Sequence, residues 1–205
     1  MPSLLVIESS PRGEHSVSRT LTAKFVDGWK ADHSGGTVVM RDLMKTHLPF
    51  VDLPWIAGAY TPAEQHSPEM KEALNTSNEL ISELMATDHI VIGTSMYNFS
   101  IPAVLKAYID HIVRVGVTFT SSYEGLVKGK KATVILASGG VYTPGAQGEA
   151  YNVASSYLKQ ILGFIGITDV TVLLAGGTAA VDMGKAKLPE FISQFVPDVS
   201  AAAKA

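Results

Sequence analysis

The chain has 205 residues, of which 46% are hydrophobic and 17% are charged, a composition that excludes an intrinsically disordered chain. The 16 lysines and arginines are outnumbered by 19 aspartates and glutamates, so the net charge is −3, and no basic cluster favours nucleic acid or an anionic membrane as a partner. The absence of cysteine excludes disulfides, thiolate metal sites and cysteine nucleophiles, and it is compatible with the cytoplasm, where we expect the protein to be located.

The N-terminal segment has no basic residue ahead of its short apolar run, which ends at Glu8, so we expect no signal peptide. The longest stretches without a charged residue are 89–105 and 132–148. Glycine, proline, serine or asparagine interrupts both of them, so we expect no membrane span.

Five short runs of apolar and β-branched residues predict strands. Polar and apolar residues do not alternate within them, which is typical of strands that are covered on both faces. In chain order, these runs are Leu4–Glu8, Thr37–Met40, His89–Thr94, Ala132–Ala137 and Asp169–Ala175.

Helical spacing of apolar residues separates these runs. Leu21, Phe25 and Trp29, for example, recur every four residues and so share one face of a helix. In chain order, the predicted helices are Ser18–Lys30, Pro68–Ala86, Pro102–Val115, Ala150–Ile165 and much of Lys185–Ala203, which Pro189 and Pro197 interrupt.

The alternation of strands and helices predicts parallel strands joined by crossover helices. We therefore expect an α/β fold, a doubly wound five-stranded parallel sheet in the flavodoxin-like order 2-1-3-4-5, within one three-layer α/β/α domain that covers residues 1–205. Two connections, at about 41–67 and 118–129, are long for a compact domain. Such loops are typically functional or lie at an interface, although the first one is also compatible with a solvent-exposed excursion.

In an open parallel sheet, ligands bind beyond the carboxyl ends of the strands, at the point where the strand order reverses. The loops after the first, third and fourth predicted strands meet there. They cover residues 9–18, 95–100 and 137–142.

The first of these loops contains four serines and leads into a helix. Hydroxyl groups and free amides at a helix N-terminus suit a phosphate dianion, and Arg12 adds a positive charge. The alternative is that Ser16 or Ser18 only caps the helix. The loop lacks both the nucleoside triphosphate motif Gly-x-x-x-x-Gly-Lys-Ser/Thr and the dinucleotide motif Gly-x-Gly-x-x-Gly, so we expect neither class of site.

The other two loops suit a flat heteroaromatic ring. Met96–Phe99 combines an amide with two aromatic side chains, and the adjacent glycines Gly139 and Gly140 allow the backbone to approach a ligand closely. Each segment also has an interpretation without a ligand. The first would simply lead into a core helix, and the two glycines would form a plain turn.

Three segments resemble the FMN-dependent NADH-azoreductases, which belong to the flavodoxin-like quinone reductases. They are Met96-Tyr97-Asn98-Phe99, the serine loop with Ser9, Ser10 and Ser16-Val17-Ser18, and Leu162–Ile167. The resemblance extends over nearly the whole chain.

This resemblance implies that the protein is a homodimer with FMN near the subunit interface, and that a reduced nicotinamide, NADH or NADPH, is its electron donor. It implies two-electron, ping-pong reduction of quinones and reductive cleavage of azo dyes to amines, without a catalytic side chain. The histidines are scattered and have no metal-ligand spacing, so we expect no metal site. The phosphate would be bound by Ser10, Ser16, Val17 and Ser18, the ring by Met96, Tyr97, Asn98 and Phe99, and its pyrimidine side by Ala137, Ser138, Gly139 and Gly140. Phe164 would line the pocket above the ring.

Several alternatives remain open. A nonenzymatic FMN carrier and a related NADPH-preferring quinone reductase fit the same fold. A hydrolase would need Ser9 or Ser10 to act with Asp110 and His111, which we instead expect at a helix surface or dimer contact. Ser95 and Ser138 replace a proline and an arginine that many family members have, so substrate preference is the property that transfers least.

Overall fold

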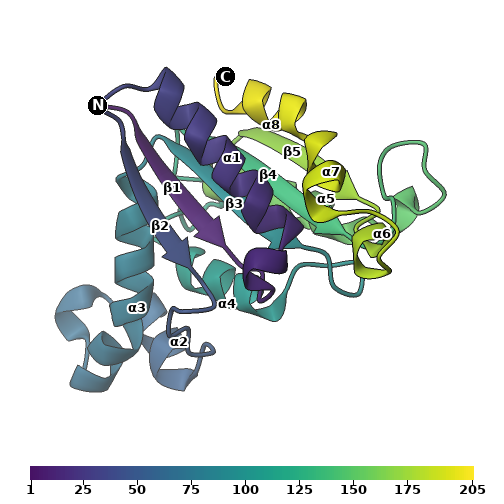
Figure 1. Ribbon diagram of the computed structural model, residues 1–205. Coiled ribbons are helices and arrows are strands. Elements are labelled where there is room, and N and C mark those ends of the chain that lie inside the picture. Colours follow the sequence, from purple (N-terminus) through teal and green to yellow (C-terminus); the bar gives the residue numbers. More distant parts are fainter.

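The computed structural model describes all residues, 1–205, and its centre is one parallel sheet of five strands (Figure 1). The strands are β1 Ser3–Glu8, β2 Thr37–Asp42, β3 His89–Ser95, β4 Lys131–Ser138 and β5 Asp169–Gly176. They pair in the order β2-β1-β3-β4-β5, which confirms the predicted order. The order reverses beside β1, so the loops after β1 and β3 leave the same sheet edge.

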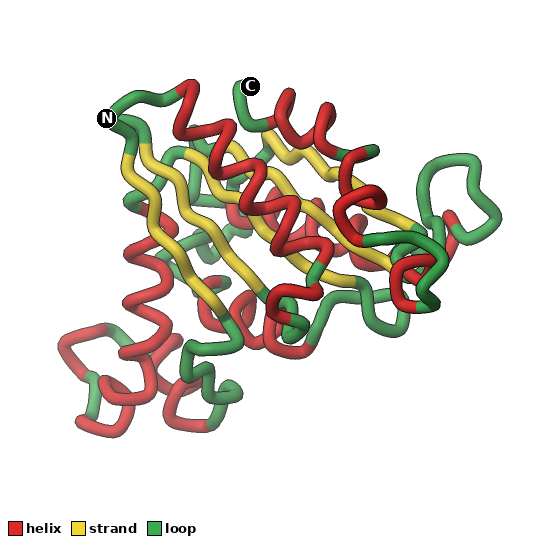
Figure 2. The backbone as a smooth tube through the Cα atoms, in the orientation of Figure 1, coloured by secondary structure: helices red, strands yellow, loops and turns green.

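Helices cover both faces of the sheet (Figure 2). They are α1 Val17–Asp32, α2 Leu53–Tyr60, α3 Pro68–Met85, α4 Ala103–Ile112, α5 Val153–Ile165, α6 Ala179–Asp182, α7 Leu188–Ser193 and α8 Val196–Ala202. Short 3₁₀ turns cover Gly13–His15, Ala63–Gln65 and Glu149–Tyr151. No helix combines the length and the apolar character that crossing a bilayer requires.

The two faces of the sheet carry separate apolar cores. Leu4 and Val6 of β1 pack with residues of α1, α7 and α8, whereas Leu5 and Ile7 pack with residues of α3, α4 and α5. Because successive side chains of a strand point to opposite faces, a continuous apolar run is needed to fill both cores. The result is the predicted three-layer α/β/α arrangement.

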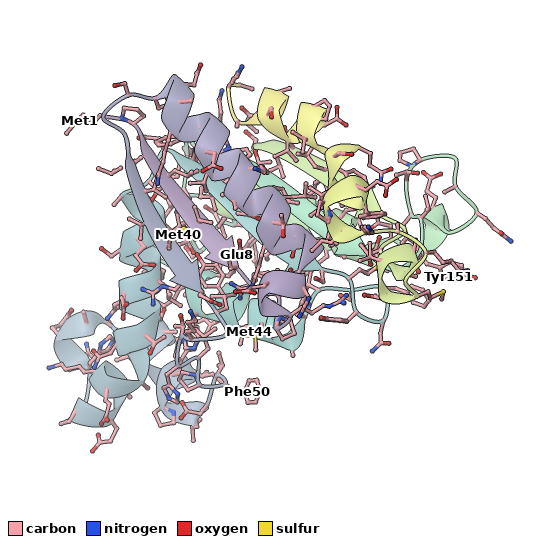
Figure 3. All side chains as sticks on the ribbon, viewed as in Figure 1. Met1, Glu8, Met40, Met44, Phe50 and Tyr151 are labelled. Atoms are coloured by element: carbon pink, nitrogen blue, oxygen red, sulfur yellow. The ribbon has the colours of Figure 1, made fainter.

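The second strand departs from the expectation that every strand is covered on both faces. β2 lies at the edge of the sheet, and its Val39 and Met40 side chains are 42% and 59% exposed. Figure 3 labels Met40 on this strand. The apolar run and the predicted order therefore located this edge strand correctly, but they did not reveal that its apolar side chains stay exposed.

The helix starts follow local chemistry. Ser16 caps α1, because its Oγ accepts the Arg19 amide at 3.2 Å. The predicted helix over 185–203 is two helices, α7 and α8, with Pro189 and Pro197 in their first turns. Proline lacks the amide needed inside a helix, so each proline begins a new helix here.

The connection at 41–67 contains regular structure, since α2 and the turn Ala63–Gln65 lie within it. Trp55 of α2 is 8% exposed, and a Cβ on Gly58 would lie 2.8 Å from Leu74 of α3, so α2 packs closely on α3. The Pro49 carbonyl, which lies 2.8 Å from His111 Nε2, joins this connection to α4. Phe50 projects away from the ribbon and is 81% exposed (Figure 3).

The connection at 118–129 is held by the end of α5. The Val127 amide donates to the Ile165 carbonyl at 2.8 Å. A Cβ on Gly125 would lie 2.3 Å from the Gly166 amide nitrogen, so only glycine fits this close approach of two backbones.

Candidate functional site

The three predicted loops converge on one cavity of about 250 Å³ beyond the carboxyl ends of the strands. It is bordered by Ser16 and Val17 from the first loop, Met96 and Tyr97 from the third, and Ala137, Ser138 and Gly139 from the fourth. Residues that are more than 100 positions apart in the sequence therefore share one wall, because β1, β3 and β4 are neighbours in the sheet.

Hydrogen bonds inside the protein shape the first loop. Ser9 Oγ donates to Thr94 Oγ1 at 2.7 Å, and the Ser9 amide donates to the Gly93 carbonyl at 3.0 Å. Ser10 Oγ accepts a longer hydrogen bond, of 3.4 Å, from the Arg12 amide. Ser9 and Ser10 are fully buried, so they fix the path of the loop from beneath.

The start of α1 carries the unused donors of this loop. Ser16 and Ser18 are 2% and 0% exposed, and one of their hydroxyls donates to the other at 3.1 Å, so the pair keeps one free hydroxyl donor. The Val17 and Ser18 amides lie in the first turn of the helix, where no carbonyl of the helix accepts them. Hydroxyls and free amides at the positive end of a helix form a donor set that suits an anion.

Arg19 clamps the first loop to β2. Its Nε donates to the Ser10 carbonyl at 2.8 Å, and its guanidinium binds both carboxylate oxygens of Asp42 at 2.7 and 3.0 Å. The hydrogen bond from Arg19 lowers the pKa of Asp42 from its ordinary value. Arg19 is therefore already paired with an anion inside the protein, and it does not border the cavity.

The third loop is a tight turn with unusual backbone angles. Tyr97 and Ser100 exchange two backbone hydrogen bonds, of 2.9 and 3.0 Å. Asn98 and Phe99 lie between them with φ angles of 49° and 69°, as in the type I′ turns that connect hairpins. Asparagine tolerates this left-handed region, whereas a bulky aromatic residue rarely adopts it.

Neighbouring residues hold Phe99 in this conformation. Its carbonyl accepts the Ala154 amide at 3.0 Å, and its ring stacks on Tyr151 with centroids 5.0 Å apart. Tyr142 meets the same ring edge-on, at 6.3 Å. Phe99 and Tyr151 stay 45% and 57% exposed, so the turn presents an aromatic surface to its surroundings.

The fourth loop is held by the segment that follows β5. The Ser138 and Gly140 carbonyls accept the Thr178 and Gly177 amides, each at 3.0 Å. The Gly139 and Gly140 amides donate to no acceptor within the protein. No heavy atom lies within 4 Å of the place where a Cβ of Gly139 would stand. A ligand therefore has open space and two free donors at this loop.

A larger cavity adjoins the first one. Its volume is about 580 Å³, it shares Tyr97 with the first cavity, and Asn98 borders it. Ile101, Pro102, Val153 and Tyr157 give it a mainly apolar lining. Ligand pockets typically reach such volumes, on the order of 300–1,000 Å³, and combine apolar walls with few polar groups.

The donor set fits the cofactor that the sequence resemblance implies. The buried hydroxyls and free amides at the start of α1 suit the FMN phosphate, and the free amides at the glycine loop suit a polar ring edge. Five of the predicted residues do not border the first cavity: Ser10, Ser18, Asn98, Phe99 and Gly140. Ser10 and Ser18 lie beneath the loop, and Asn98 belongs to the adjoining cavity.

Sequence reasoning overlooked the segment after β5. Thr178 and Asp182 border the first cavity, as does Ser95 at the end of β3. Since β5 pairs with β4 in the predicted order, the loop after β5 leaves the same sheet edge, and the Gly176-Gly177-Thr178 sequence was the available signal. Phe164 lies against Phe119, with ring centroids 4.8 Å apart, and its predicted place above a flavin stays a prediction.

A buried carboxyl group lies beneath the first loop. Glu8, which Figure 3 labels, ends β1. It is 4% exposed, and its Oε2 has no hydrogen-bond partner. Burial raises the pKa of Glu8 from 4.5 to about 7, although the nearby Arg19 guanidinium opposes this change. Glu8 therefore stays largely protonated in mildly acidic solution.

The hydrolase alternative finds no support in the geometry. Ser9 donates to Thr94, whereas His111 is completely buried beside the Pro49 carbonyl. The expectation that His111 lies at a helix surface was therefore wrong, because the 41–67 connection covers that part of α4. No three His, Asp or Glu side chains are grouped so that they could hold a metal ion.

Comparisons with known proteins agree with this geometry. A family model for the flavodoxin-like fold matches residues 2–196. The FMN-dependent NADH:quinone oxidoreductase 8 of Burkholderia lata is 52% identical over 203 residues, covering 99% of this chain and 97% of that protein. The FMN-dependent NADH:quinone oxidoreductase 2 of Jannaschia sp. is 50% identical over 204 residues, covering all of both chains.

Solved structures are similar over the same length. An azoreductase from Bacillus anthracis str. Sterne superposes with a TM-score of 0.87 at 28% identity, covering 100% of this chain and 99% of its own. An FMN-dependent NADH-azoreductase from B. anthracis str. Ames Ancestor, in complex with FMN, superposes with a TM-score of 0.86 at 26% identity and covers 98% of this chain and 97% of its own.

The fold, and a ligand cavity where its strand order reverses, define a flavodoxin-like protein. The chain belongs to the flavodoxin-like family that includes the FMN-dependent NADH:quinone oxidoreductases.

Proposed function

We propose that this protein is an FMN-dependent NADH:quinone oxidoreductase. One observation carries the proposal: three loops meet at adjoining cavities on one sheet edge. The first loop offers hydrogen-bond donors suited to a phosphate, the third an aromatic turn with an amide side chain, and the fourth two adjacent glycines. The names of the two relatives at 52% and 50% identity support the same cofactor, donor and acceptor.

The phosphate of FMN would be bound at the start of α1. The Ser16 hydroxyl and the Val17 and Ser18 amides would be the donors. The Ser18 hydroxyl would support Ser16 from beneath through their 3.1 Å hydrogen bond, and the buried Ser10 would hold the loop in place. Each hydrogen bond to a charged group contributes roughly 1.5–3 kcal/mol, so several of them anchor a phosphate firmly. This assignment predicts that riboflavin, which lacks the phosphate, binds far more weakly than FMN.

The flat ring would lie between the third and fourth loops. Met96–Phe99 would run along it, with the Asn98 amide reading its heteroatoms, and Ala137–Gly140 would contact the pyrimidine side. When bound, FMN supplies hydride transfer between a nicotinamide and an acceptor. The free Gly139 and Gly140 amides would stabilise negative charge at the pyrimidine edge, a role that needs no ionisable side chain.

We further propose that the nicotinamide electron donor and the electron acceptor bind to the same site one after the other, which gives ping-pong kinetics. The aromatic surface of Phe99 and Tyr151 and the apolar cavity beside Tyr157 accept flat molecules without distinguishing them strongly. Aromatic azo compounds fit the same description. Their cleavage to two amines consumes four electrons and therefore two turnovers.

We also propose a homodimer in which FMN lies near the interface, in the cytoplasm. Phe50, Leu53 and Tyr60 are 81%, 77% and 75% exposed, and the nearby Val51 and Trp55 border an apolar cavity between α2, α4 and α5. Several large apolar side chains exposed on one short segment, beside an apolar cavity, suit a protein interface. Sedimentation of the purified protein, with and without FMN, tests the oligomeric state.

The function is tested by colour and turnover. Purified protein is expected to be yellow, to bleach when NADH is added under nitrogen, and to oxidise NADH steadily with menadione as acceptor. Parallel double-reciprocal lines would support the ping-pong scheme, and intersecting lines would contradict it. Reduction of the flavin without steady turnover would identify a nonenzymatic carrier, and parallel assays with NADPH and methyl red measure donor preference and azo cleavage.

A further inference from the structure

Arg12 and Asp182 form an ion pair beside the proposed phosphate site. Arg12 belongs to the loop after β1, whereas Asp182 ends α6 and lies 170 positions further along the chain. One guanidinium nitrogen donates to Asp182 Oδ2 at 3.2 Å, and the other pairs with Oδ1. Both side chains border the cavity that contains Ser16 and Val17.

The same ion pair borders a second cavity on the outside of the site. This cavity has a volume of about 450 Å³ and is completed by His15, Val181 and Leu188. The Arg12 and Asp182 side chains are 41% and 43% exposed, so water reaches the pair. Exposed ion pairs contribute little to stability, and Arg12 has no other hydrogen-bond acceptor for its side chain. Replacing Asp182 with another anion as the partner of Arg12 therefore costs little free energy.

Charge makes such an exchange favourable when a phosphate is present. Arg12 is the one cation among the residues that border the first cavity, since Arg19 is engaged with Asp42 and Ser10. The Asp182 carboxylate borders the same cavity and would repel a phosphate dianion. A phosphate monoester offers up to two negative charges and three acceptor oxygens, against one charge on the carboxylate.

We propose that Arg12 leaves Asp182 and pairs with the FMN phosphate when the cofactor binds, so that Asp182 is an internal competitor that lowers cofactor affinity. The inference rests on the proposed function and deepens it. It adds a cation to a phosphate site whose other donors are neutral. It also gives the overlooked segment after β5 a role in cofactor retention.

Fluorescence titration of the flavin-free, full-length protein with FMN and with riboflavin tests this proposal. Arg12→Gln is expected to weaken FMN binding by on the order of tenfold, whereas Asp182→Asn tightens it several-fold, and riboflavin binding stays the same in both. Arg12→Lys retains the charge and is expected to fall between the wild type and Arg12→Gln. Lys30→Gln and Asp27→Asn, two exposed positions elsewhere on α1, are the matched charge controls.

The double variant separates partner exchange from simple repulsion. If Asp182 competes for Arg12, most of the gain from Asp182→Asn disappears once Arg12 is glutamine, and only the part due to direct repulsion of the phosphate remains. A gain of undiminished size in the Arg12→Gln background overturns the exchange, and so does a change shared equally by FMN and riboflavin. Thermal unfolding midpoints within a few degrees of the wild type ensure that the affinities describe folded protein.

The same titration distinguishes the two levels of inference. Tight FMN binding by the wild type, together with single variants that leave it unchanged, rejects the role of Arg12 and Asp182 but retains the proposed function. Failure of the wild type to bind FMN rejects both.

Discussion

Glu8 makes the stability of this protein depend on pH in a direction opposite to that of most carboxylates. Burial raises its pKa from 4.5 to about 7, because the ionised form has lost its water and its Oε2 has no hydrogen-bond partner. Gly93 confines the group, since a Cβ at that position would lie 2.7 Å from Oε2. The folded protein therefore binds a proton that the unfolded chain releases above pH 4.5.

The sign of the effect follows from this difference in proton binding. Below pH 4.5 both states hold the proton and the stabilising contribution is complete, and it is lost progressively as the pH rises to about 7. Each unit of pKa corresponds to about 1.4 kcal/mol, so the loss amounts to about 3 kcal/mol. Above pH 7 the contribution of Glu8 no longer changes with pH.

Glu8→Gln removes the ionisable group while keeping its size. Urea unfolding of the wild type and the variant between pH 4.5 and 8 measures the difference between their free energies of unfolding. We expect this difference to shift by about 3 kcal/mol in favour of the variant as the pH rises. Glu72→Gln, at an exposed position on α3, controls for the general effect of losing a carboxylate.

The reasoning is refuted if the two free-energy curves run parallel across this range. Parallel curves would mean that Glu8 has the same pKa in the folded and unfolded states. The burial of Glu8 beneath the first loop would then not separate it from water as the structure indicates.

The remaining predictions concern the backbone and the proposed site. Gly125→Ala is expected to lower the free energy of unfolding by at least about 2 kcal/mol, because the added Cβ would meet the Gly166 backbone. Gly163→Ala is expected to raise it by about 0.5–1 kcal/mol, because this glycine lies inside α5 and a Cβ there has open space. Equal thermal stability of the two variants would contradict this. Ser16→Ala removes the cap of α1 and should cost about 1 kcal/mol in urea unfolding as well as weakening FMN binding but not riboflavin binding. Asn98→Gly and Asn98→Ala should both weaken FMN binding, but only the alanine, strained at φ 49°, should lose about 1 kcal/mol of stability.

The elements and their order were largely determined by the sequence. β-branched runs such as His89–Thr94 gave the strands to within two residues at each end, because the period of a strand is a local property. Pro189 and Pro197 predicted that the last helix is interrupted. The alternation of strand and helix then favoured the order 2-1-3-4-5, which brought three distant loops to one sheet edge.

Tertiary structure alone decided the properties that depend on partners distant in the sequence. No local pattern shows that Val39 and Met40 of β2 stay exposed, that His111 is covered by the Pro49 segment, or that Asp182 meets Arg12 across 170 positions. Propensity and periodicity act over a few neighbouring residues, whereas burial and charge pairing depend on which segments the sheet brings together. The raised pKa of Glu8 belongs to this second kind, since a glutamate at the end of an apolar strand carries no sign of what will cover it.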